Sequence, residues 1–269
     1  MIRHVLTIDL EDWFHCLEPD PSRWARLPRR AEATTREILD LLDEHGATAT
    51  FFVLGDVATH APALIRELAA RGHDVGSHGT SHQLITRQSP AEFRRDLRES
   101  LARLEDVTGR PVCSYRAPYF SITRQTLWAL DILVEEGIRH DSSIFPVVNH
   151  RYGIPDARRS PHWVRPELME WPISVMRTPL GNVPFSGGVY FRWLPMALIE
   201  RGFASVAASG DPVVFYLHPW ELDPDHPRYF TGSPFLFVRH YGRLRGTRDR
   251  LRGLLARHRF GSLAQAGAA

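Results

Sequence analysis

The stretch ATATFFVLGDVATHAPALIRELAARGHDVGSH, residues 47–78, contains two expected strands separated by an expected helix. Residues 47–55 read as a buried strand and residues 73–78 as a second, shorter one. Between them, residues 62–72 have the pattern of a helix that begins at a proline and ends at a glycine. A strand, a crossover helix and another strand are typical of parallel pairing with a right-handed connection.

The same alternation extends along most of the chain. Thr34 and Glu37 fit a capping box, so we expect a helix to begin there. Further strands are expected at residues 4–10, 111–116, 138–143 and 211–218, and further helices at residues 34–46, 89–109, 123–137 and 194–210. About six βα units indicate the α/β class, with either a (β/α) barrel or an open, doubly wound sheet.

Two regions depart from this alternation. Residues 144–192 are rich in proline, glycine and aromatic residues, which predicts an insertion before the last strands. Residues 222–269 form a C-terminal extension that is first polar and proline-rich and then basic, and we interpret the basic part as a solvated amphipathic helix. We therefore expect a single catalytic domain over residues 1–269.

Composition limits the classes of partner. The chain has 269 residues, of which 43% are hydrophobic, and its formal net charge is +2, which gives no reason to expect nucleic acid or an anionic membrane as the main partner. Cys16 and Cys113 form neither a disulfide framework nor a cysteine metal site. Neither a signal peptide nor an apolar run of the ~20 residues that a membrane span needs is visible, so a cytoplasmic location is expected.

Ionisable side chains gather at the carboxyl ends of the expected strands. They are Asp9, Glu11, Asp12, His78, His82, Arg116, Asp141 and His218. Each of them alone has an ordinary structural explanation, such as capping a loop or pairing at the surface. Because the carboxyl ends of parallel strands meet on one face, we expect them to converge there. Burying so many ionisable groups without a function would cost several kcal/mol each, which favours the interpretation as a metal-dependent hydrolase.

His78 and His82 are four residues apart, with only small residues between them. In a helical turn this spacing places two imidazoles on one face, where both can bind one divalent ion. A third ligand is needed, and a carboxylate after the first strand is the expected one. Two imidazoles and a carboxylate are typical of a catalytic metal site; they suit Zn²⁺, with Co²⁺, Mn²⁺ or Ni²⁺ as alternatives.

The set and its order resemble the polysaccharide deacetylases, the carbohydrate esterase family with NodB homology. The stretches that correspond to the five motifs of that family are TIDLED (7–12), HGTSH (78–82), RAPY (116–119), HDSS (140–143) and LHP (217–219). The resemblance covers roughly residues 2–221. The stretches DLEDWFH, HDSSIFP and LHPWELD are more similar to the branch found in exopolysaccharide and exosortase-linked gene clusters.

This resemblance implies a distorted (β/α) barrel of the NodB type. It also implies a metal-dependent hydrolase that removes N-acetyl groups from an N-acetylhexosamine polysaccharide or its precursor, in exopolysaccharide biosynthesis. Asp9 would be the catalytic base, held ionised by Arg116. The backbone N–H of Tyr119 would help to stabilise the oxyanion, His218 would protonate the leaving amine, and Asp141 would orient His218.

The chain departs from the family pattern at the acidic pair, which is spread here over Asp9, Glu11 and Asp12. By order, Asp9 resembles the base. We favour Asp12 as the third metal ligand with His78 and His82, because the family ligand is an aspartate. The alternative is Glu11, which strand alternation would place on the same face as Asp9.

Other functions remain open at this stage. The same scaffold is compatible with an acetyl-ester hydrolase or with an amidase for small ureides. A non-catalytic glycan-binding relative, or a metal-independent barrel lyase or isomerase, is a further alternative. The intact RAPY stretch, the two histidines and His218 favour an active hydrolase over these.

Overall fold

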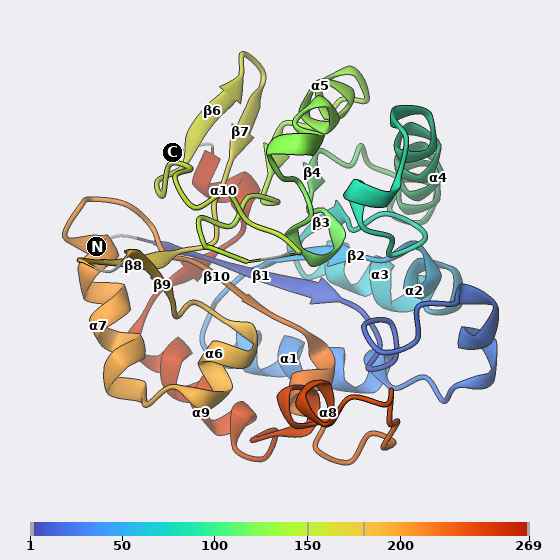
Figure 1. The fold of residues 1–269 in the computed structure, drawn as a ribbon. Coiled ribbons are helices and arrows are strands. Elements are labelled where there is room, and N and C mark those ends of the chain that lie inside the picture. Colours follow the sequence, from blue (N-terminus) through green and yellow to red (C-terminus); the bar gives the residue numbers. More distant parts are fainter. Residues whose placement is uncertain (1–2, 150, 180, 268–269) are drawn as a thin grey trace.

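The computed structural model describes residues 3–149, 151–179 and 181–267, and it places one mixed β-sheet at the centre with helices around it (Figure 1). The strands are β1 (His4–Leu10), β2 (Thr50–Val53), β3 (Asp74–Ser77), β4 (Ser114–Tyr115), β5 (His140–Asp141), β6 (His162–Arg165), β7 (Leu168–Glu170), β8 (Val175–Thr178), β9 (Gly181–Pro184), β10 (Val214–Leu217) and β11 (Phe260–Gly261). The α-helices are α1 (Ala31–Glu44), α2 (Gly55–His60), α3 (Pro62–Ala70), α4 (Pro90–Thr108), α5 (Trp128–Glu135), α6 (Gly188–Trp193), α7 (Met196–Ala207), α8 (Pro234–Tyr241), α9 (Thr247–Arg257) and α10 (Leu263–Gly267). Short 3-10 helices are η1 (Pro21–Arg26), η2 (Ile85–Arg87), η3 (Pro118–Phe120), η4 (Arg124–Thr126) and η5 (Pro219–Leu222). Within the described ranges, the helices all lack the length and apolarity that a membrane crossing requires.

The central sheet has the strand order β10-β1-β2-β3-β4-β5-β7-β6, and β11 also pairs with β1. Its pairs are parallel except for the antiparallel β6–β7 pair. The segment after β7 returns to β10 and is hydrogen-bonded to it. The N–H of Ser174 donates to the carbonyl of Val214 at 3.2 Å, and the N–H of Tyr216 donates to the carbonyl of Ser186 at 3.0 Å. The sheet is thus curled into a half-barrel, and the predicted distorted (β/α) barrel is confirmed.

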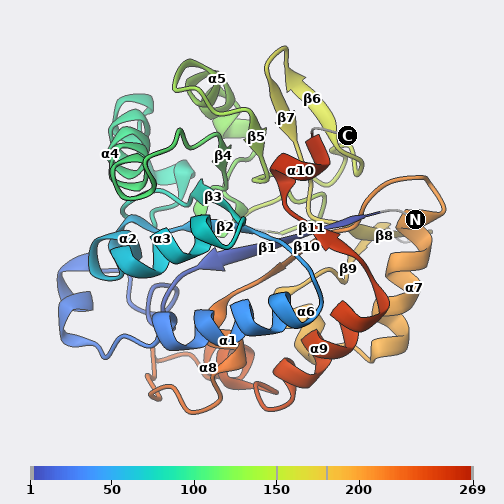
Figure 2. The same ribbon diagram turned by 180° about the vertical axis from the view of Figure 1, so that it is seen from behind.

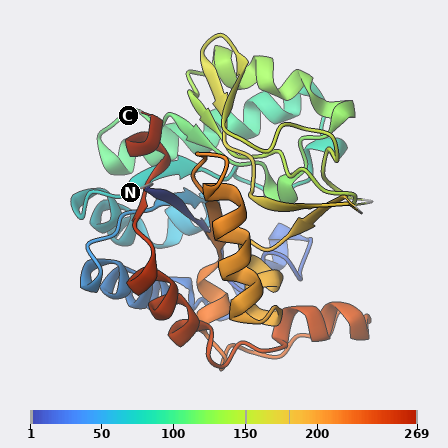
Figure 3. The same cartoon turned by 90° about the vertical axis from the view of Figure 1, so that its left-hand side faces the viewer.

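Amphipathic helices cover the outer face of the curled sheet. Figure 2 shows α1, α3 and α9 on the side of the sheet that faces away from the separate β8–β9 ribbon. In α1 the side chains of Ile38, Leu39 and Leu42 are fully buried, as the helical spacing of apolar residues requires. Figure 3 shows the C-terminal segment, coloured red, returning to the sheet, where β11 pairs with β1.

Helix boundaries follow the sequence signals in one case and differ in another. The capping box of α4 is formed by Ser89 and Glu92, as expected. The capping box expected at Thr34 was wrong: α1 begins three residues earlier, and the Thr34 hydroxyl donates to the carbonyl of Arg30 at 3.2 Å inside the helix. The physical reason is that the carboxylate of Asp12, which lies outside the helix, accepts the N–H groups at the start of α1.

The predicted insertion at residues 144–192 contains ordered structure of its own. It includes the β6–β7 hairpin and the β8–β9 ribbon. β7 pairs in parallel with β5 and therefore extends the central sheet by two strands. This segment consequently contributes buried side chains next to the strand ends, among them Glu170.

Candidate active site

Two carboxylates come from β1 and the residue after it. Asp9 lies within β1, between β2 and β10, and Glu11 follows the strand directly. Because side chains alternate along an extended chain, Asp9 and Glu11 project to the same side. Both are buried, with exposed fractions of 2% and 3%. The fold therefore brings two carboxylates together at the carboxyl end of a central strand.

His78 and His82 lie in the loop that follows β3, and not in a helical turn as expected. Asp96 of α4 holds this loop, because its carboxylate accepts two backbone N–H groups of the loop at 2.9 Å each. Gly79 has a φ of +74°, and a Cβ at this position would lie 2.7 Å from the Asp96 carboxylate. Gly79 is thus required for the loop to approach α4.

The two imidazoles converge on one carboxylate oxygen. Nε2 of His78 and Nε2 of His82 each lie 3.3 Å from Oε1 of Glu11. Their other ring nitrogens are already bound: Nδ1 of His78 to the carbonyl of Arg116 at 2.8 Å, and Nδ1 of His82 to the carbonyl of His15 at 3.2 Å. Because a carbonyl accepts only from N–H, these bonds favour the tautomer in which both Nε2 lone pairs face Glu11.

This donor set fits a divalent metal ion. Nε2 of both histidines and Oε2 of Glu11 are buried and lack a hydrogen-bond partner in the described part of the chain. Burial alone would raise the pKa of Glu11, but His82 and His78, when each carries a proton on Nε2, hold that pKa well below its usual value. An ionised carboxylate and two imidazole nitrogens, close enough to share one ion, are ligands that Zn²⁺ and related metals accept.

Asp12, the carboxylate that the sequence favoured as third ligand, is engaged elsewhere. Its oxygens accept the backbone N–H groups of Arg30 at 2.9 Å, Ala31 at 3.2 Å and Trp13 at 3.1 Å. It therefore caps α1, whose own N-cap residue, Arg30, makes no capping hydrogen bond with its side chain. Glu11, the alternative to Asp12, is the carboxylate beside the two histidines, and this geometry favours Glu11 as the proposed third ligand.

Arg116 follows β4 and is completely buried. Its Nη1 donates to Oδ1 of Asp9 at 2.6 Å and to the hydroxyl of Thr7 at 2.9 Å. Its Nε and Nη2 donate to the carbonyl and the hydroxyl of Ser142 at 2.9 and 2.7 Å. With these donors in place the guanidinium has a fixed position, and it holds the Asp9 carboxylate in one orientation.

His218 follows β10 and completes the group. Its Nε2 lies 3.6 Å from Oε1 of Glu11 and 3.8 Å from Oδ2 of Asp9. Its side chain is 18% exposed, which makes it the most accessible member. Burial alone would lower the pKa of this histidine, but Glu221, Glu11 and Asp9 together raise it to about 9. A histidine in this state is protonated at neutral pH.

Asp141, which was expected to orient His218, contacts other groups. Within the described ranges, its carboxylate accepts from the hydroxyl of Ser143 and pairs with Glu170 of β7. Burial raises the pKa of Asp141 to about 6. Burial and the adjacent Asp141 carboxylate raise the pKa of Glu170 well above its usual value. The nitrogen Nδ1 of His218 instead lies 3.3 Å from Oε2 of Glu221.

The backbone beside the site is strained. In the described part of the chain, four residues other than glycine have a positive φ, and three of them are His82, Tyr119 and Phe120, at +53°, +56° and +53°. Such conformations cost on the order of 1–3 kcal/mol each and persist where the surroundings enforce them. Here the Tyr119 ring packs on His82 with centroids 4.6 Å apart. Tyr119, the expected oxyanion donor, is therefore next to the proposed ligands.

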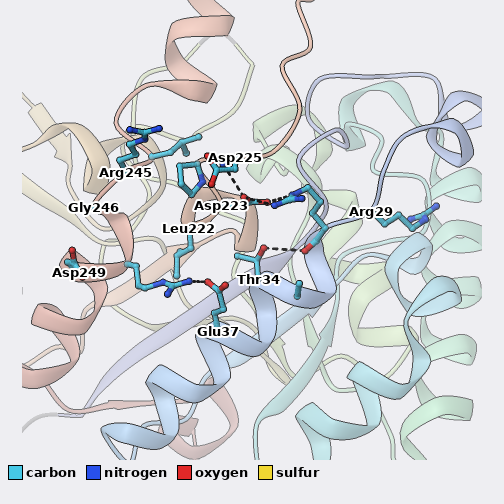
Figure 4. A pocket seen from close by; sticks show the side chains of 14 residues that line it. Arg29, Thr34, Glu37, Leu222, Asp223, Asp225, Arg245, Gly246 and Asp249 are labelled. Atoms are coloured by element: carbon cyan, nitrogen blue, oxygen red, sulfur yellow. Dashed lines mark hydrogen bonds and ion pairs between the residues drawn. The ribbon is translucent and has the colours of Figure 1, made fainter.

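The cavity in Figure 4 is a separate feature. It has a volume of about 610 Å³ and is lined by residues from the start of α1, the end of η5 and the start of α9. Four of its charged side chains are paired with each other, Arg30 with Asp223 and Glu37 with Arg248. Because its lining includes no proposed ligand or catalytic residue, we do not assign the chemistry to this cavity.

Sequence reasoning missed three buried residues around the site: Glu170, Arg192 and Glu221. Glu221 had a signal, since it stands three residues after His218 in LHPWELD. No sequence signal indicated Arg192 or Glu170, because both lie in the region where the alternation of strands and helices is interrupted. Only the packing of β7 and α6 brings them toward the strand ends.

Comparison with known proteins places two families along the chain. Residues 24–133 match the polysaccharide deacetylase family, and residues 142–268 match a domain of unknown function. The first match includes His78, His82 and Arg116, and the second includes His218 and Glu221. The candidate site is thus assembled from both matched segments and from β1, which precedes them.

Characterised relatives align with only part of the chain. The peptidoglycan-N-acetylglucosamine deacetylase PgdA of Listeria monocytogenes is 34% identical over 95 residues, which are 35% of this chain and 20% of that protein. The chitooligosaccharide deacetylase of a Bradyrhizobium strain is 32% identical over 100 residues, which are 37% of this chain and 43% of that protein. The matched stretch thus spans less than half the length of these relatives.

Solved structures are similar over almost the whole chain. A candidate polysaccharide deacetylase from Mycobacterium smegmatis superposes with a TM-score of 0.62 at 20% identity, over 97% of this chain and 87% of that one. A CE4 family pseudoenzyme from Bacillus anthracis superposes with a TM-score of 0.52 at 13% identity, over 98% of this chain and 64% of that one. At these identities the similarity establishes the fold alone.

Proposed function

From the match of residues 24–133 to the polysaccharide deacetylase family, we propose that the chain is a metal-dependent hydrolase that removes N-acetyl groups from an N-acetylhexosamine glycan. The observation that carries the proposal is the group of Glu11, His78 and His82, with unpartnered donor atoms, directly beside Asp9 and His218. When bound by the first three residues, a divalent ion would polarise the acetyl carbonyl and increase the acidity of water.

The other residues supply proton transfer and orientation. Asp9, held by Arg116, takes the proton of the attacking water. The backbone N–H of Tyr119 donates to the oxyanion, an interaction worth about 2.7–4 kcal/mol in comparable sites. His218 gives its proton to the nitrogen as the C–N bond breaks, because an amine leaves readily only in neutral form. The position of His218 supports this role, since its Nε2 faces the site, 3.8 Å from Oδ2 of Asp9.

The test is acetate release from N-acetylglucosamine oligomers, coupled to metal analysis of the purified protein. We expect release to stop after treatment with EDTA and to return with Zn²⁺, Co²⁺, Mn²⁺ or Ni²⁺, of which we propose Zn²⁺ as the most suitable. Full activity of a protein shown to be metal-free would refute the metal dependence. An absence of acetate release from every N-acetylated glycan offered would refute the substrate class.

The finer assignment concerns the substrate. We propose a role in exopolysaccharide biosynthesis, supported by the stretches DLEDWFH, HDSSIFP and LHPWELD. The alternative is an acetyl-ester or small-amide hydrolase on the same scaffold. Comparing acetate release from N-acetylglucosamine oligomers with release from acetylated xylan separates the two. Binding of a glycan without any release would instead indicate a non-catalytic relative.

A further inference from the structure

Residues 142–268, which match a domain of unknown function, contain both His218 and the groups that hold it. Oε2 of Glu221 accepts the backbone N–H of His218 at 3.1 Å and lies 3.3 Å from its Nδ1. Glu221 is completely buried, so this carboxylate is not shared with solvent. A carboxylate at Nδ1 fixes the orientation of the ring, and here the opposite nitrogen, Nε2, faces Glu11 and Asp9.

Arg192 of α6 holds Glu221 from the other side. Its Nε donates to Oε1 of Glu221 at 2.9 Å. Its remaining N–H groups donate to backbone carbonyls at the end of α8: Arg239 at 2.9 Å, His240 at 3.1 Å, and Gly242. Arg192 is only 2% exposed. Each charge of this buried pair is therefore matched, which is the condition under which such a pair is tolerated.

Aromatic rings confine His218 laterally. Trp220 stacks on His218 with centroids 5.1 Å apart, and His240 of α8 stacks on Trp220 with centroids 4.1 Å apart. The guanidinium carbon of Arg192 lies 5.5 Å from the centre of the Trp220 ring. The rings and the ion pair thus converge on His218 from α6, η5 and α8.

We propose that Glu221 is the positioning residue of His218, and that the segment 142–268 serves to present this histidine, with Arg192 and the end of α8 holding Glu221 in place. The inference rests on the proposed function, in which His218 is the proton donor. It assigns to Glu221 the role that the sequence suggested for Asp141, whose carboxylate is engaged by Ser143 and Glu170.

The deciding experiment is a double-mutant cycle with Glu221→Gln, His218→Gln and the double variant, each as the full, zinc-loaded chain. We expect Glu221→Gln to lower kcat on an N-acetylglucosamine oligomer by about 10- to 100-fold, as loss of a histidine's supporting partner does elsewhere, with little change in KM. The loss on an aryl acetate ester should be smaller, because its leaving group needs no proton.

In the His218→Gln background, Glu221→Gln should have no further effect, since the two residues act as a unit. Equal losses in both backgrounds, or equal losses on oligomer and ester, would overturn the positioning role. Asp141→Asn is the matched control: its effect should be the same in both backgrounds. If Glu221→Gln does not fold, Glu221→Asp keeps the charge beside Arg192 and should show the same substrate dependence.

A readout independent of turnover separates this inference from the function on which it rests. The proton on Nδ1 of His218, bound to a carboxylate, should give a strongly downfield NMR resonance that Glu221→Gln removes and Asp141→Asn leaves. If that holds while the wild-type chain releases no acetate, the deacetylase proposal fails and the positioning role stands. If acetate is released but the resonance is unaffected by Glu221→Gln, the positioning role fails.

Discussion

Nη1 of Arg116 donates a 2.6 Å hydrogen bond to Oδ1 of Asp9, and the guanidinium that makes this bond is completely enclosed by protein. The same guanidinium donates to Thr7 in β1 and to Ser142 just after β5, so its position is set by strands that lie on either side of β4 in the sheet. Asp9 is consequently held with its other oxygen, Oδ2, on the side of His218, at 3.8 Å from Nε2.

Replacing Asp9 with Asn tests its role as base. The amide keeps the shape and still accepts from Arg116, so the fold and the metal content should be retained. Turnover of an N-acetylated oligomer should fall by about 100- to 10,000-fold, the usual contribution of a positioned acid or base. Steady-state kinetics and metal quantification on the same preparation check this; near-normal turnover would remove Asp9 from the mechanism.

Glu11→Gln and Asp12→Asn form a matched pair that identifies the third ligand. Glu11→Gln should weaken Zn²⁺ binding by at least about tenfold, or about 1.4 kcal/mol. Asp12→Asn should leave Zn²⁺ binding intact and instead lower the free energy of unfolding by about 1–3 kcal/mol, because an amide NH2 cannot accept the N–H groups of Arg30 and Ala31 that one carboxylate oxygen accepts. Metal titration and urea denaturation measure both quantities. The reverse result would restore Asp12 as the ligand.

The Asp141–Glu170 pair predicts a dependence of stability on pH. Glu170 has a pKa raised well above the ordinary value of 4.5, so the folded chain binds a proton there that the unfolded chain releases. Stability from this group is therefore present below pH 4.5 and is lost as pH rises toward the raised pKa, by at most about 1.4 kcal/mol per pH unit. Glu170→Gln, which can still accept the N–H of Ile144, should flatten this decline. Parallel wild-type and variant curves of unfolding free energy against pH would contradict the assignment.

Gly187 permits the close approach of the irregular segment to β10. Its φ is +132°, and a Cβ there would lie 1.9 Å from the carbonyl oxygen of Tyr216, two residues before His218. Gly187→Ala should lower the free energy of unfolding by about 1–3 kcal/mol or more. Gly210→Ala is the control, because Gly210 also has a positive φ but open space around it. Equal destabilisation of the two in urea would show that backbone strain, and not the contact with Tyr216, is responsible.

The sequence predicted most elements that place residues at the strand ends. Strand β1 and helix α4 have the expected extents, because a run of β-branched and apolar residues, and a capping box followed by a helical pattern, are local signals. The start of α1 was misplaced because its first N–H groups are bound by Asp12, eighteen residues earlier than Arg30. No local sequence pattern indicates a hydrogen bond between residues so far apart in the chain.

The sequence by itself determined which residues reach one edge of the sheet, since the carboxyl ends of parallel strands share a face regardless of detail. Only the tertiary structure decided which carboxylate meets His78 and His82, and which acid meets His218. Asp12 is adjacent to Glu11 and differs from it by one methylene group, so their separate roles come from the partners that packing supplies: N–H groups of α1 for one, two imidazoles for the other. Glu221 lies beside His218 in place of Asp141 for the same reason. Strand β7 brings Glu170 next to Asp141, and helix α6 brings Arg192 next to Glu221.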